Sequence, residues 1–377
     1  MRIVYLTTES LYGKINSGSL MCSYSNFMML KRISEDNLFH IYLDTEPQNK
    51  NNSVCSFKRE ENRWKKLALS LTNRRYLSGK KEMEIANLIL EQRPDLVFYE
   101  GPYWSNVISK VKSRLSKTVF VLFMHNVEKF YYENLRRNSV SHEILYRLTC
   151  KCEEKSIKLA DKIICLNSRD GIQMQKEYGR KADMFLPINI VDKYDQRLIP
   201  GKYIEKTLLF IGTMFPPNYD GVKWFVENVM PELPEYKLVI VGRGFEEVKE
   251  SLKADNVEVI GSVDNLTDYY MKYPILIMPI FYGAGMKVKT AEAMMYGKSI
   301  FATEEALEGY NASNIEGIYE CNTKEEFISG IKKIFDNDMY QSVQNSVRQH
   351  FLENFETNKL YNKFRDTLHA WMNKESE

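Results

Sequence analysis

The sequence contains no long hydrophobic run. Spanning a bilayer takes roughly 18–20 consecutive apolar residues, whereas the best run in this chain of 377 residues, Val119–Met124, has six. The opening residues, MRIVYLTTES, have a charge at position 2, no long apolar centre and no small-residue cleavage site, which is unlike a signal peptide. We therefore predict a short strand at the N-terminus and expect a cytoplasmic protein.

The patterns that hold metal ions are also missing. Cys150 and Cys152 are separated by one residue, which is shorter than the spacing in zinc sites, and there is no second pair. No His-Glu-x-x-His pattern or EF-hand loop is present, and no Asp-x-Asp metal site is evident at the end of a predicted strand. We expect no obligatory metal ion or other cofactor, and reduced thiols without a function at every cysteine: Cys22, Cys55, Cys150, Cys152, Cys165 and Cys321.

Motifs for nucleotide cofactors and nucleic acids fail as well. Gly242-Arg243-Gly244 lacks the third glycine of a dinucleotide fingerprint, because position 247 is Glu. The stretch after the first predicted strand, LTTESLYGKINSG, supplies no such fingerprint either, which argues against a nicotinamide-dependent oxidoreductase. Gly297-Lys298-Ser299 imitates the end of a P-loop without its earlier glycine. The basic residues accompany no nucleic-acid reader motif, so we expect no nucleic-acid partner.

The charge is unevenly distributed. Residues 1–190 hold 31 Lys and Arg against 21 Asp and Glu, a net charge of +10, and the remainder is −8, which sums to the net charge of +2. The segment Lys58–Lys81 contains nine basic residues, and apolar residues such as Trp64, Leu67 and Leu71 lie between them. A basic amphipathic segment of this kind can lie on an anionic membrane surface. A solvated helix face or loop is the alternative of equal weight.

Continuous apolar runs alternate with stretches of helical periodicity. Such runs are typical of strands that are buried on both faces of a parallel sheet, and their alternation with helices predicts βαβ units. Helices are predicted at Val222–Val229, Lys287–Tyr296 and Asn358–Asn373. The predicted strands are Ile3–Leu6, Phe39–Leu43, Leu96–Tyr99, Val119–Met124, Ile163–Leu166, Leu208–Ile211, Leu238–Val241, Val257–Ile260, Ile275–Met278 and Ser299–Thr303.

Two sets of about five strands predict an α/β protein with two Rossmann-like domains. The pattern breaks near 191–206, around Pro200 and Gly201. We therefore place the first domain at 1–193 and the second at 205–350, and expect a C-terminal helix, 351–377, that packs back toward the first domain. A ligand is expected at the carboxyl ends of the strands, in a cleft between the two sheets.

The most informative stretch is PIFYGAGMKVKTAEAMMYGKSIFATEEALE, residues 279–308. A buried strand ends before Pro279, the turn Gly283-Ala284-Gly285 follows, and a helix is predicted to begin near Met286. Small residues let a ligand approach the backbone, and free N–H groups with the helix dipole attract anions. Lys287 and Lys289 add positive charge where a helix disfavours it, which suggests an anion to neutralise.

Glu292 follows these lysines on the same predicted helix. A carboxylate there can accept two hydrogen bonds from a cis-diol such as a ribose. The alternative is a surface ion pair between Lys289 and Glu292, three residues apart, which contributes a few tenths of a kcal/mol. The glycines at the end of the strand favour the ligand site.

This segment resembles the donor-binding signature of glycosyltransferase family 4 (glycosyltransferase group 1), whose members are retaining enzymes with the GT-B fold. The resemblance covers most of the second domain. It includes TLLFIGTMFPPNYDGVKWF at 207–225, KLVIVGRG at 237–244 and VIGSVDNL at 259–266. It implies two Rossmann-like domains whose parallel sheets face each other across a cleft, and transfer of a sugar from a nucleotide-diphosphate donor with retention at the anomeric carbon.

The resemblance also implies roles for single residues of the second domain. Glu292 would bind the ribose hydroxyls, and Lys287 would hold the diphosphate and help the nucleotide to leave. Backbone around Val263 would meet the nucleobase. The remaining donor-binding residues are Gly212, Thr213, Arg243, Gly283, Ala284, Gly285, Met286 and Lys289.

In the first domain, VFVLFMHNVE places His125 at the end of a strand, where it is similar to the family histidine that touches the donor sugar. A lone histidine is usually structural, but its position before Asn126 and Glu128 favours the catalytic role. Ser17-Gly18-Ser19 resembles the family's glycine-rich loop near the acceptor. His125 and Lys287 are thus the predicted catalytic residues.

Two residues depart from the family pattern. Many members carry two glutamates eight positions apart, and Ala284 stands at the first of these positions. Many also carry a basic residue where this chain has Thr213. The leaving diphosphate would then depend more on Lys287, Lys289 and Arg243, so these departures bear on the identity of the donor.

The predicted function is therefore metal-independent sugar transfer of the hexosyltransferase type to a glycan or lipid-linked acceptor in bacterial surface polysaccharide synthesis, with the enzyme peripheral at the inner face of the plasma membrane. Two alternatives keep the same architecture. A sugar-nucleotide 2-epimerase would turn over the donor without an acceptor, and a non-catalytic sugar-nucleotide-binding protein would lose the phosphate contacts.

Overall fold

The computed structural model describes residues 1–13, 15, 17–47, 51–136, 139–195, 197, 206–336, 339 and 342–373. These residues divide into two compact units. Unit 1 comprises Met1–Pro187 with Tyr361–Glu377, and unit 2 comprises Ile188–Leu360. Most of the predicted break at 191–206, including Pro200 and Gly201, lies outside the described residues.

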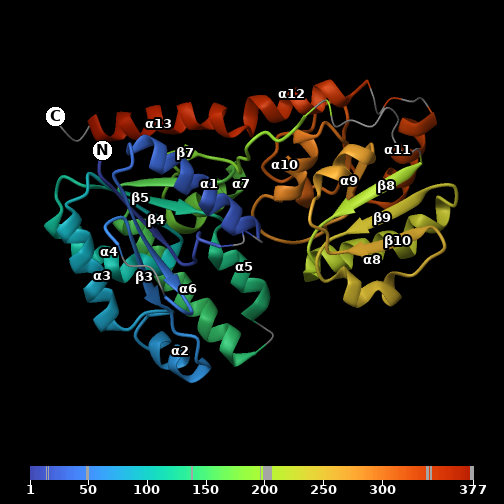
Figure 1. The fold of residues 1–377 in the computed structure, drawn as a ribbon. Helices are drawn as coiled ribbons and strands as arrows, with labels where there is room; N and C mark the ends of the chain where they lie inside the picture. Colours follow the sequence, from blue (N-terminus) through green and yellow to red (C-terminus); the bar gives the residue numbers. More distant parts are fainter. Residues whose placement is uncertain are drawn as a thin grey trace. The chain divides into compact units, whose positions relative to one another are not determined.

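Unit 1 contains a seven-stranded sheet in the order β3-β2-β1-β4-β5-β6-β7, and every pairing in it is parallel. Figure 1 shows helices on both faces of the sheet. The strands are β1 (Ile3–Thr7), β2 (Leu38–Asp44), β3 (Val54–Lys58), β4 (Leu96–Glu100), β5 (Val119–Met124), β6 (Lys162–Cys165) and β7 (Met184–Phe185). The helices are α1 (Gly18–Ile33), α2 (Arg63–Ser70), α3 (Gly79–Gln92), α4 (Ser105–Val111), α5 (Glu128–Leu135), α6 (Val140–Leu159), α7 (Ser168–Tyr178) and most of α13 (Thr357–Asn373).

Unit 2 contains a six-stranded parallel sheet in the order β10-β9-β8-β11-β12-β13. Its strands are β8 (Thr207–Ile211), β9 (Lys237–Val241), β10 (Val257–Gly261), β11 (Ile275–Met278), β12 (Ser299–Ala302) and β13 (Ile318–Glu320). Its helices are α8 (Pro216–Asn228), α9 (Thr267–Lys272), α10 (Val288–Met295), α11 (Lys324–Asp336) and α12 (Gln344–Asn354). The prediction of an α/β protein with two parallel-sheet domains is confirmed.

The central strands carry the apolar runs on which the prediction depended. All residues of β4, β5, β8 and β11 are buried. The prediction missed β3, β7 and β13, which lie at sheet edges and are exposed in part. The predicted strand Ser299–Thr303 ends one residue earlier, and the predicted helix at 222–229 begins at Pro216 because proline suits the first turn of a helix.

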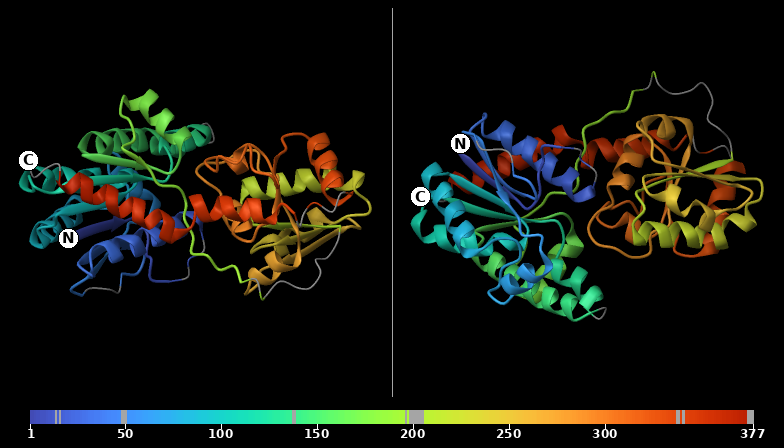
Figure 2. Two further views of the ribbon diagram at one scale, coloured as in Figure 1. Left: turned by 90° about the horizontal axis from the view of Figure 1, so that it is seen from above. Right: turned by 60° about the horizontal axis from the view of Figure 1, so that its bottom comes forward.

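The boundaries of the units differ from the predicted domains. Residues 188–193 belong to unit 2, where the Asp192 carboxylate binds the Arg348 guanidinium at 2.5 Å and Ile190 pairs with Glu356. The C-terminal segment 351–377 is not one helix, because α12 ends at Asn354 and α13 begins at Thr357. From Tyr361 on, α13 belongs to unit 1, and Figure 2 shows this helix from two further directions.

Candidate functional site

The topology of the two sheets locates the candidate sites. Both sheets contain the strand order 3-2-1-4-5-6, in which the direction of winding reverses between the first and the fourth strand. Ligands of open α/β sheets bind outside the carboxyl ends of the strands at this reversal. The reversal lies between β1 and β4 in unit 1 and between β8 and β11 in unit 2. The predicted site residues follow these strands or their neighbours in each unit.

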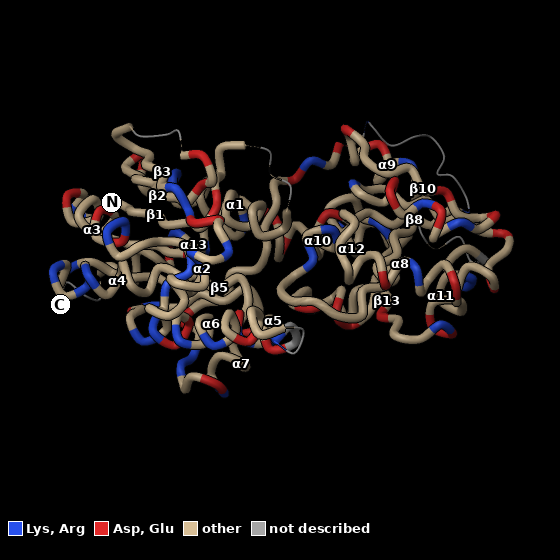
Figure 3. Tube along the Cα trace, turned by 90° about the horizontal axis from the view of Figure 1, so that it is seen from below, with Lys and Arg blue, Asp and Glu red and all other residues tan. Residues whose placement is uncertain are grey.

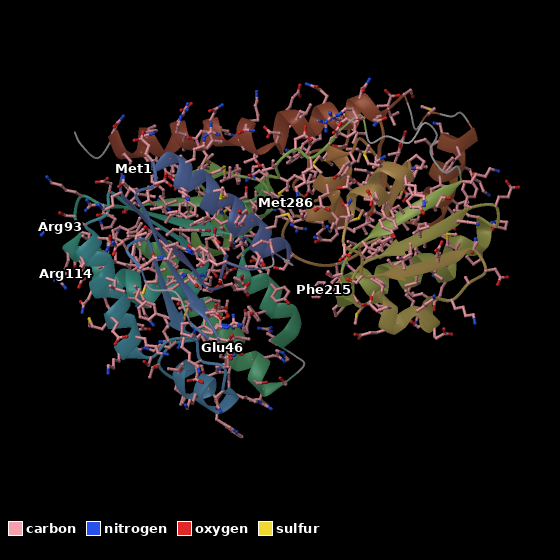
Figure 4. The ribbon with its side chains drawn as sticks, in the orientation of Figure 1. Met1, Glu46, Arg93, Arg114, Phe215 and Met286 are labelled. Carbon is pink, nitrogen blue, oxygen red and sulfur yellow. The ribbon has the colours of Figure 1, made fainter. Side chains whose placement is uncertain are left out.

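In unit 2, the turn Gly283–Met286 leads from β11 into α10. Gly285 has φ of 64°, a backbone conformation that favours glycine. In the part of the chain that the structure describes, the backbone N–H groups of Gly283, Ala284, Gly285 and Met286 donate to no protein acceptor. Met286 is labelled in Figure 4. The turn therefore offers free donors at the N-terminal end of a helix, where an anion is favoured.

Lys287 lies beside this turn. The helix α10 begins at Val288, one residue after the predicted start at Lys287, and Lys287 is its N-cap with extended backbone. Its Nζ donates to the Gly285 carbonyl at 2.9 Å and contacts the Glu305 carboxylate at 2.5 Å. The side chains of Lys287 and Glu305 are only 13% and 16% exposed. The lysine is thus held against the turn by a carboxylate that the sequence did not identify.

Glu292, one turn into α10, is held by two donors on the same carboxylate oxygen. The Tyr270 hydroxyl from α9 donates to Oε2 at 2.9 Å, and Lys289 Nζ contacts it at 2.6 Å. Burial, with the Glu292 charge beside it, raises the pKa of Tyr270 well above its ordinary value, so that the tyrosine stays a donor. Among the described residues nothing bonds to Oε1. The carboxylate is 14% exposed and keeps one oxygen for a ligand.

The Pro-Asn-x-Asp-Gly motif joins the loops of unit 2. The Asn218 amide donates to the Thr213 carbonyl at 2.8 Å, in the loop after β8. The Asp220 carboxylate accepts from the Tyr282 hydroxyl at 2.5 Å, in the loop after β11. Gly221 lies so close to this second loop that a Cβ would be 1.7 Å from the Pro279 carbonyl oxygen. The motif therefore positions both loops from the first turns of α8.

The other predicted donor-binding residues lie at the carboxyl ends of β8, β9 and β10. A Cβ at Gly242, after β9, would be 1.6 Å from the carbonyl oxygen of Gly212, after β8, so these loops touch through their backbones. The Arg243 carbonyl accepts from Met214 N at 2.8 Å, and the Arg243 side chain is exposed. Val263 is half-buried in the loop between β10 and α9. Because the strands are parallel, these loops and the turn at Gly283 all lie at the carboxyl ends of the strands.

In unit 1, His125 directly follows β5 and binds a buried carboxylate. Its Nε2 is 3.0 Å from Glu100 Oε2, at the end of the neighbouring strand β4. Burial, which lowers the pKa of His125, is outweighed by the Glu100 charge, so this pKa lies well above its ordinary value. Conversely, His125 and nearby donors outweigh burial and lower the pKa of Glu100. The pair is therefore charged at neutral pH.

The predicted acceptor loop lies at the start of α1. Ser17 is the N-cap of this helix, and its Oγ accepts from Leu20 N at 3.2 Å. Gly18 and Ser19 begin the helix, with the Ser19 hydroxyl 3.2 Å from that of Ser17. The next turn of α1 supplies Ser23, whose hydroxyl donates to Glu100. The structure thus brings the helix that carries the predicted loop to the His125 pair, and it gives Ser17 a structural role.

Glu100, Tyr270 and Glu305 were not predicted from the sequence. A signal existed for Glu100, because it ends the apolar run of β4 and so lies beside the end of β5 in a parallel sheet. Tyr270 and Glu305 reach α10 from other elements, and neither has a local signal. Asn126 and Glu128, the predicted neighbours of His125, do not supply its main contact.

The basic segment Lys58–Lys81 runs from the end of β3 through α2 into α3. Within it, Trp64 is 76% exposed and Leu71 is 81% exposed, and α2 contains no buried residue. Arg75 is drawn inward among the rings of Tyr76, Tyr103 and Tyr132. In the view of Figure 3, basic and acidic residues are interspersed along the chain. Arg75 therefore contributes less to the exposed basic surface than its place in the sequence indicated.

Among the residues that the structure describes, no helix has the length and apolar character of a membrane span. The same described residues contain no cluster of three or more His, Cys, Asp or Glu side chains arranged to hold a metal ion. The structure describes all six cysteines, and none of them forms a disulfide.

Comparisons with known proteins agree with this architecture. Residues 205–337 match the family described as Glycosyl transferases group 1. A Klebsiella pneumoniae protein described as an uncharacterized 44.6 kDa protein in the cps region is 26% identical over 315 residues, 76% of this chain and 77% of its own length.

Two solved structures resemble the whole chain. Sucrose-phosphate synthase from Thermosynechococcus elongatus superposes with a TM-score of 0.70 at 12% identity, covering 99% of this chain and all of its own. Anabaena HepE in complex with UDP superposes with a TM-score of 0.67 at 12% identity, covering 98% of this chain and all of its own. The chain therefore has the GT-B fold, and the match to Glycosyl transferases group 1 covers most of unit 2.

Proposed function

We propose that this protein is a retaining glycosyltransferase that moves a sugar from a nucleotide-diphosphate donor to a glycan or lipid-linked acceptor in the synthesis of a bacterial surface polysaccharide. The observation that carries the proposal is the turn Gly283–Met286, whose free N–H groups lie beside Lys287 and lead into the helix that carries Glu292. The cps-region relative supports the polysaccharide context. The UDP complex of HepE supports a nucleoside diphosphate as the leaving group.

The donor nucleotide would bind through its ribose to Glu292. Oε2 is taken by Tyr270 and Lys289, so these two residues fix the carboxylate while Oε1 accepts from the ribose hydroxyls. The ion pair of Lys289 and Glu292 is therefore part of the site in this proposal. Backbone near Val263 would contact the base, since the adjoining α9 supplies Tyr270.

The diphosphate would lie over the turn at Gly283. Free N–H groups and the N-terminal end of α10 meet negative charge as it develops on the leaving group, a contribution that is usually large in catalysis. Lys287 Nζ is 3.4 Å from the position that a Cβ on Gly283 would take, so the ammonium already lies beside the turn. The exposed side chain of Arg243 would approach from the loop after β9.

In the proposed reaction the bond between the anomeric carbon and the diphosphate oxygen breaks. The acceptor oxygen bonds to the same face of that carbon, and its proton passes to the departing diphosphate. Atoms and charge balance without a covalent enzyme intermediate, and we propose that His125 contacts the transferred sugar. We also propose that no divalent ion is obligatory.

A nucleotide screen tests the donor site. The full-length protein is melted with UDP-, GDP- and ADP-sugars, and one of them at 100 times its Kd should add about 2.7 kcal/mol of stability. Glu292→Gln should weaken that ligand roughly 10- to 100-fold, because charge-assisted hydrogen bonds to the ribose are lost. Glu250→Gln, at an exposed site on the same unit, should not.

Turnover tests the reaction. With membrane glycolipid as acceptor, release of the nucleoside diphosphate should persist in EDTA, and the anomeric proton coupling of the product should show the configuration of the donor. If no nucleotide sugar binds, the proposal is wrong. Turnover without an acceptor would point to a 2-epimerase, binding without turnover to a non-catalytic protein, and an inverted product would contradict retention.

We further propose that the exposed part of Lys58–Lys81 brings unit 1 to an anionic membrane surface that carries the acceptor. Arg63 and Lys65 on α2 are exposed beside Trp64, which suits an interfacial helix. Each lysine or arginine near such a surface contributes about 1 kcal/mol.

Co-sedimentation with vesicles tests this membrane contact. Vesicles with phosphatidylglycerol should retain the wild-type protein better than neutral vesicles, and the double variant Arg63→Glu with Lys65→Glu should abolish that difference. Lys332→Glu with Lys333→Glu, on α11 of unit 2, makes the same charge change elsewhere and should leave it. Equal binding of the wild-type protein to both kinds of vesicle would contradict the proposal.

A further inference from the structure

We propose that Glu100 is the positioning residue of His125, fixing the orientation and the charge of the imidazole ring. The inference rests on the proposed function in one respect, the assignment of His125 to sugar transfer. The arrangement of the two side chains is independent of that assignment.

The backbone places the two groups together. Glu100 is the last residue of β4, and it is registered with Phe123 on the neighbouring strand β5. His125 comes two residues after Phe123, so its side chain emerges on the same side just beyond the end of the strand. The result is a contact of 3.0 Å between His125 Nε2 and Glu100 Oε2.

Glu100 is saturated with donors from three other positions. Its Oε1 accepts from the Tyr5 hydroxyl at 2.5 Å and from the Asn26 amide at 2.8 Å. Its Oε2 accepts from the Ser23 hydroxyl in addition to His125. A carboxylate has about four acceptor sites. Glu100 therefore has none left for the proton of an acceptor sugar, which argues against a role as a general base.

Exposure separates the roles of the two residues. The side chain of Glu100 is 4% exposed, and that of His125 is 23% exposed. A substrate can reach the ring but not the carboxylate behind it. Glu100 thus acts through His125, as the buried aspartate of a hydrolase triad acts through its histidine.

Other titratable groups lie near the ring. The Cys22 thiol on α1 hydrogen-bonds to His125, and burial raises the pKa of this thiol. Burial also raises the pKa of Glu128 on α5 and that of Tyr5 on β1. Glu100 is the carboxylate in hydrogen-bond contact with the ring, and its charge raises the pKa of His125.

The test measures the ring and the reaction separately. In full-length protein with labelled histidine, His125 is assigned by NMR with a His125→Gln variant, and its titration is followed by pH. Glu100→Gln should move the titration of His125 to a lower pH and reduce kcat roughly 10- to 100-fold, as loss of a supporting hydrogen-bond partner does at other sites. The limb on which kcat falls with rising pH should move to lower pH with it.

Two variants make the result specific. Glu82→Gln removes another buried carboxylate of unit 1, which binds Arg74 and Lys110, and should leave the His125 titration unchanged. Glu100→Asp keeps the charge on a shorter side chain. It should keep the raised titration while lowering kcat, and it replaces Glu100→Gln if that variant does not fold.

The outcomes are distinguishable from failure of the proposed function. An unchanged titration of His125 in Glu100→Gln overturns the inference, whether or not the protein transfers sugar. A shifted titration with an unchanged kcat also overturns it. If the wild-type protein binds no nucleotide sugar, the proposed function fails, and the titration alone decides whether Glu100 fixes the ring.

Discussion

Lys287→Ala is expected to lower kcat by about 100-fold or more while changing KM little. Preorganised donors aimed at a developing negative charge contribute roughly this much. Lys287 Nζ lies against the turn at Gly283, held by Glu305, so its charge requires little reorganisation when the diphosphate leaves. Steady-state kinetics with the donor found in the nucleotide screen checks the prediction.

The variant also leaves Glu305 without its ion-pair partner, and a mostly buried carboxylate in that state destabilises the fold. The double variant Lys287→Ala with Glu305→Gln removes this effect and should keep the loss of kcat. Lys324→Ala breaks an exposed ion pair with Glu232 on the same unit and should not affect kcat. A normal kcat in the double variant would remove Lys287 from the mechanism.

Gly221→Ala is expected to be among the most destabilising single substitutions in unit 2. A Cβ would be 1.7 Å from the Pro279 carbonyl oxygen, so α8 or the loop after β11 must move. Alanine is favoured over glycine in helices by about 1 kcal/mol, but overpacking against backbone outweighs this. We expect a loss of about 3 kcal/mol or more, which corresponds to a fall in Tm of roughly 6–12 °C.

Thermal unfolding measures this loss. Gly79→Ala is the matched control, because Gly79 also lies in a helix, α3, but its Cβ would make only ordinary contacts with Arg74. It should change stability by less than about 1 kcal/mol. Similar stabilities of the two variants would show that the approach of α8 to Pro279 is not a tight constraint.

The sequence predicted the centre of each sheet better than its edges. A strand buried on both faces must be continuously apolar, and β5 and β8 are recognisable for that reason. The edge strand β3 contains Ser56 and ends at Lys58, and such a strand has no obligatory pattern. The two residues of β7 are too few to show any period.

Candidate site residues could be recognised from the sequence where they lie close together in one segment. Gly283 to Glu292 form one continuous segment, so their spacing could be read directly. Tyr270 and Glu305, which hold Glu292 and Lys287, come from other elements, and only packing brings them to α10. The same holds for Asp220, which binds Tyr282 across 62 residues.

The helix α13 is synthesised last, but it packs on unit 1, most of which is synthesised first. Phe364 and Leu368 of α13 are fully buried in unit 1, where Phe364 packs against Phe98 and Tyr361 lies under the Arg32 guanidinium at 3.9 Å. A ribosome therefore releases the strands of unit 1 first but supplies the covering of their face last, after the whole of unit 2. A premature stop shortly after residue 360 would thus damage the upstream half of the protein rather than the half that had just been made.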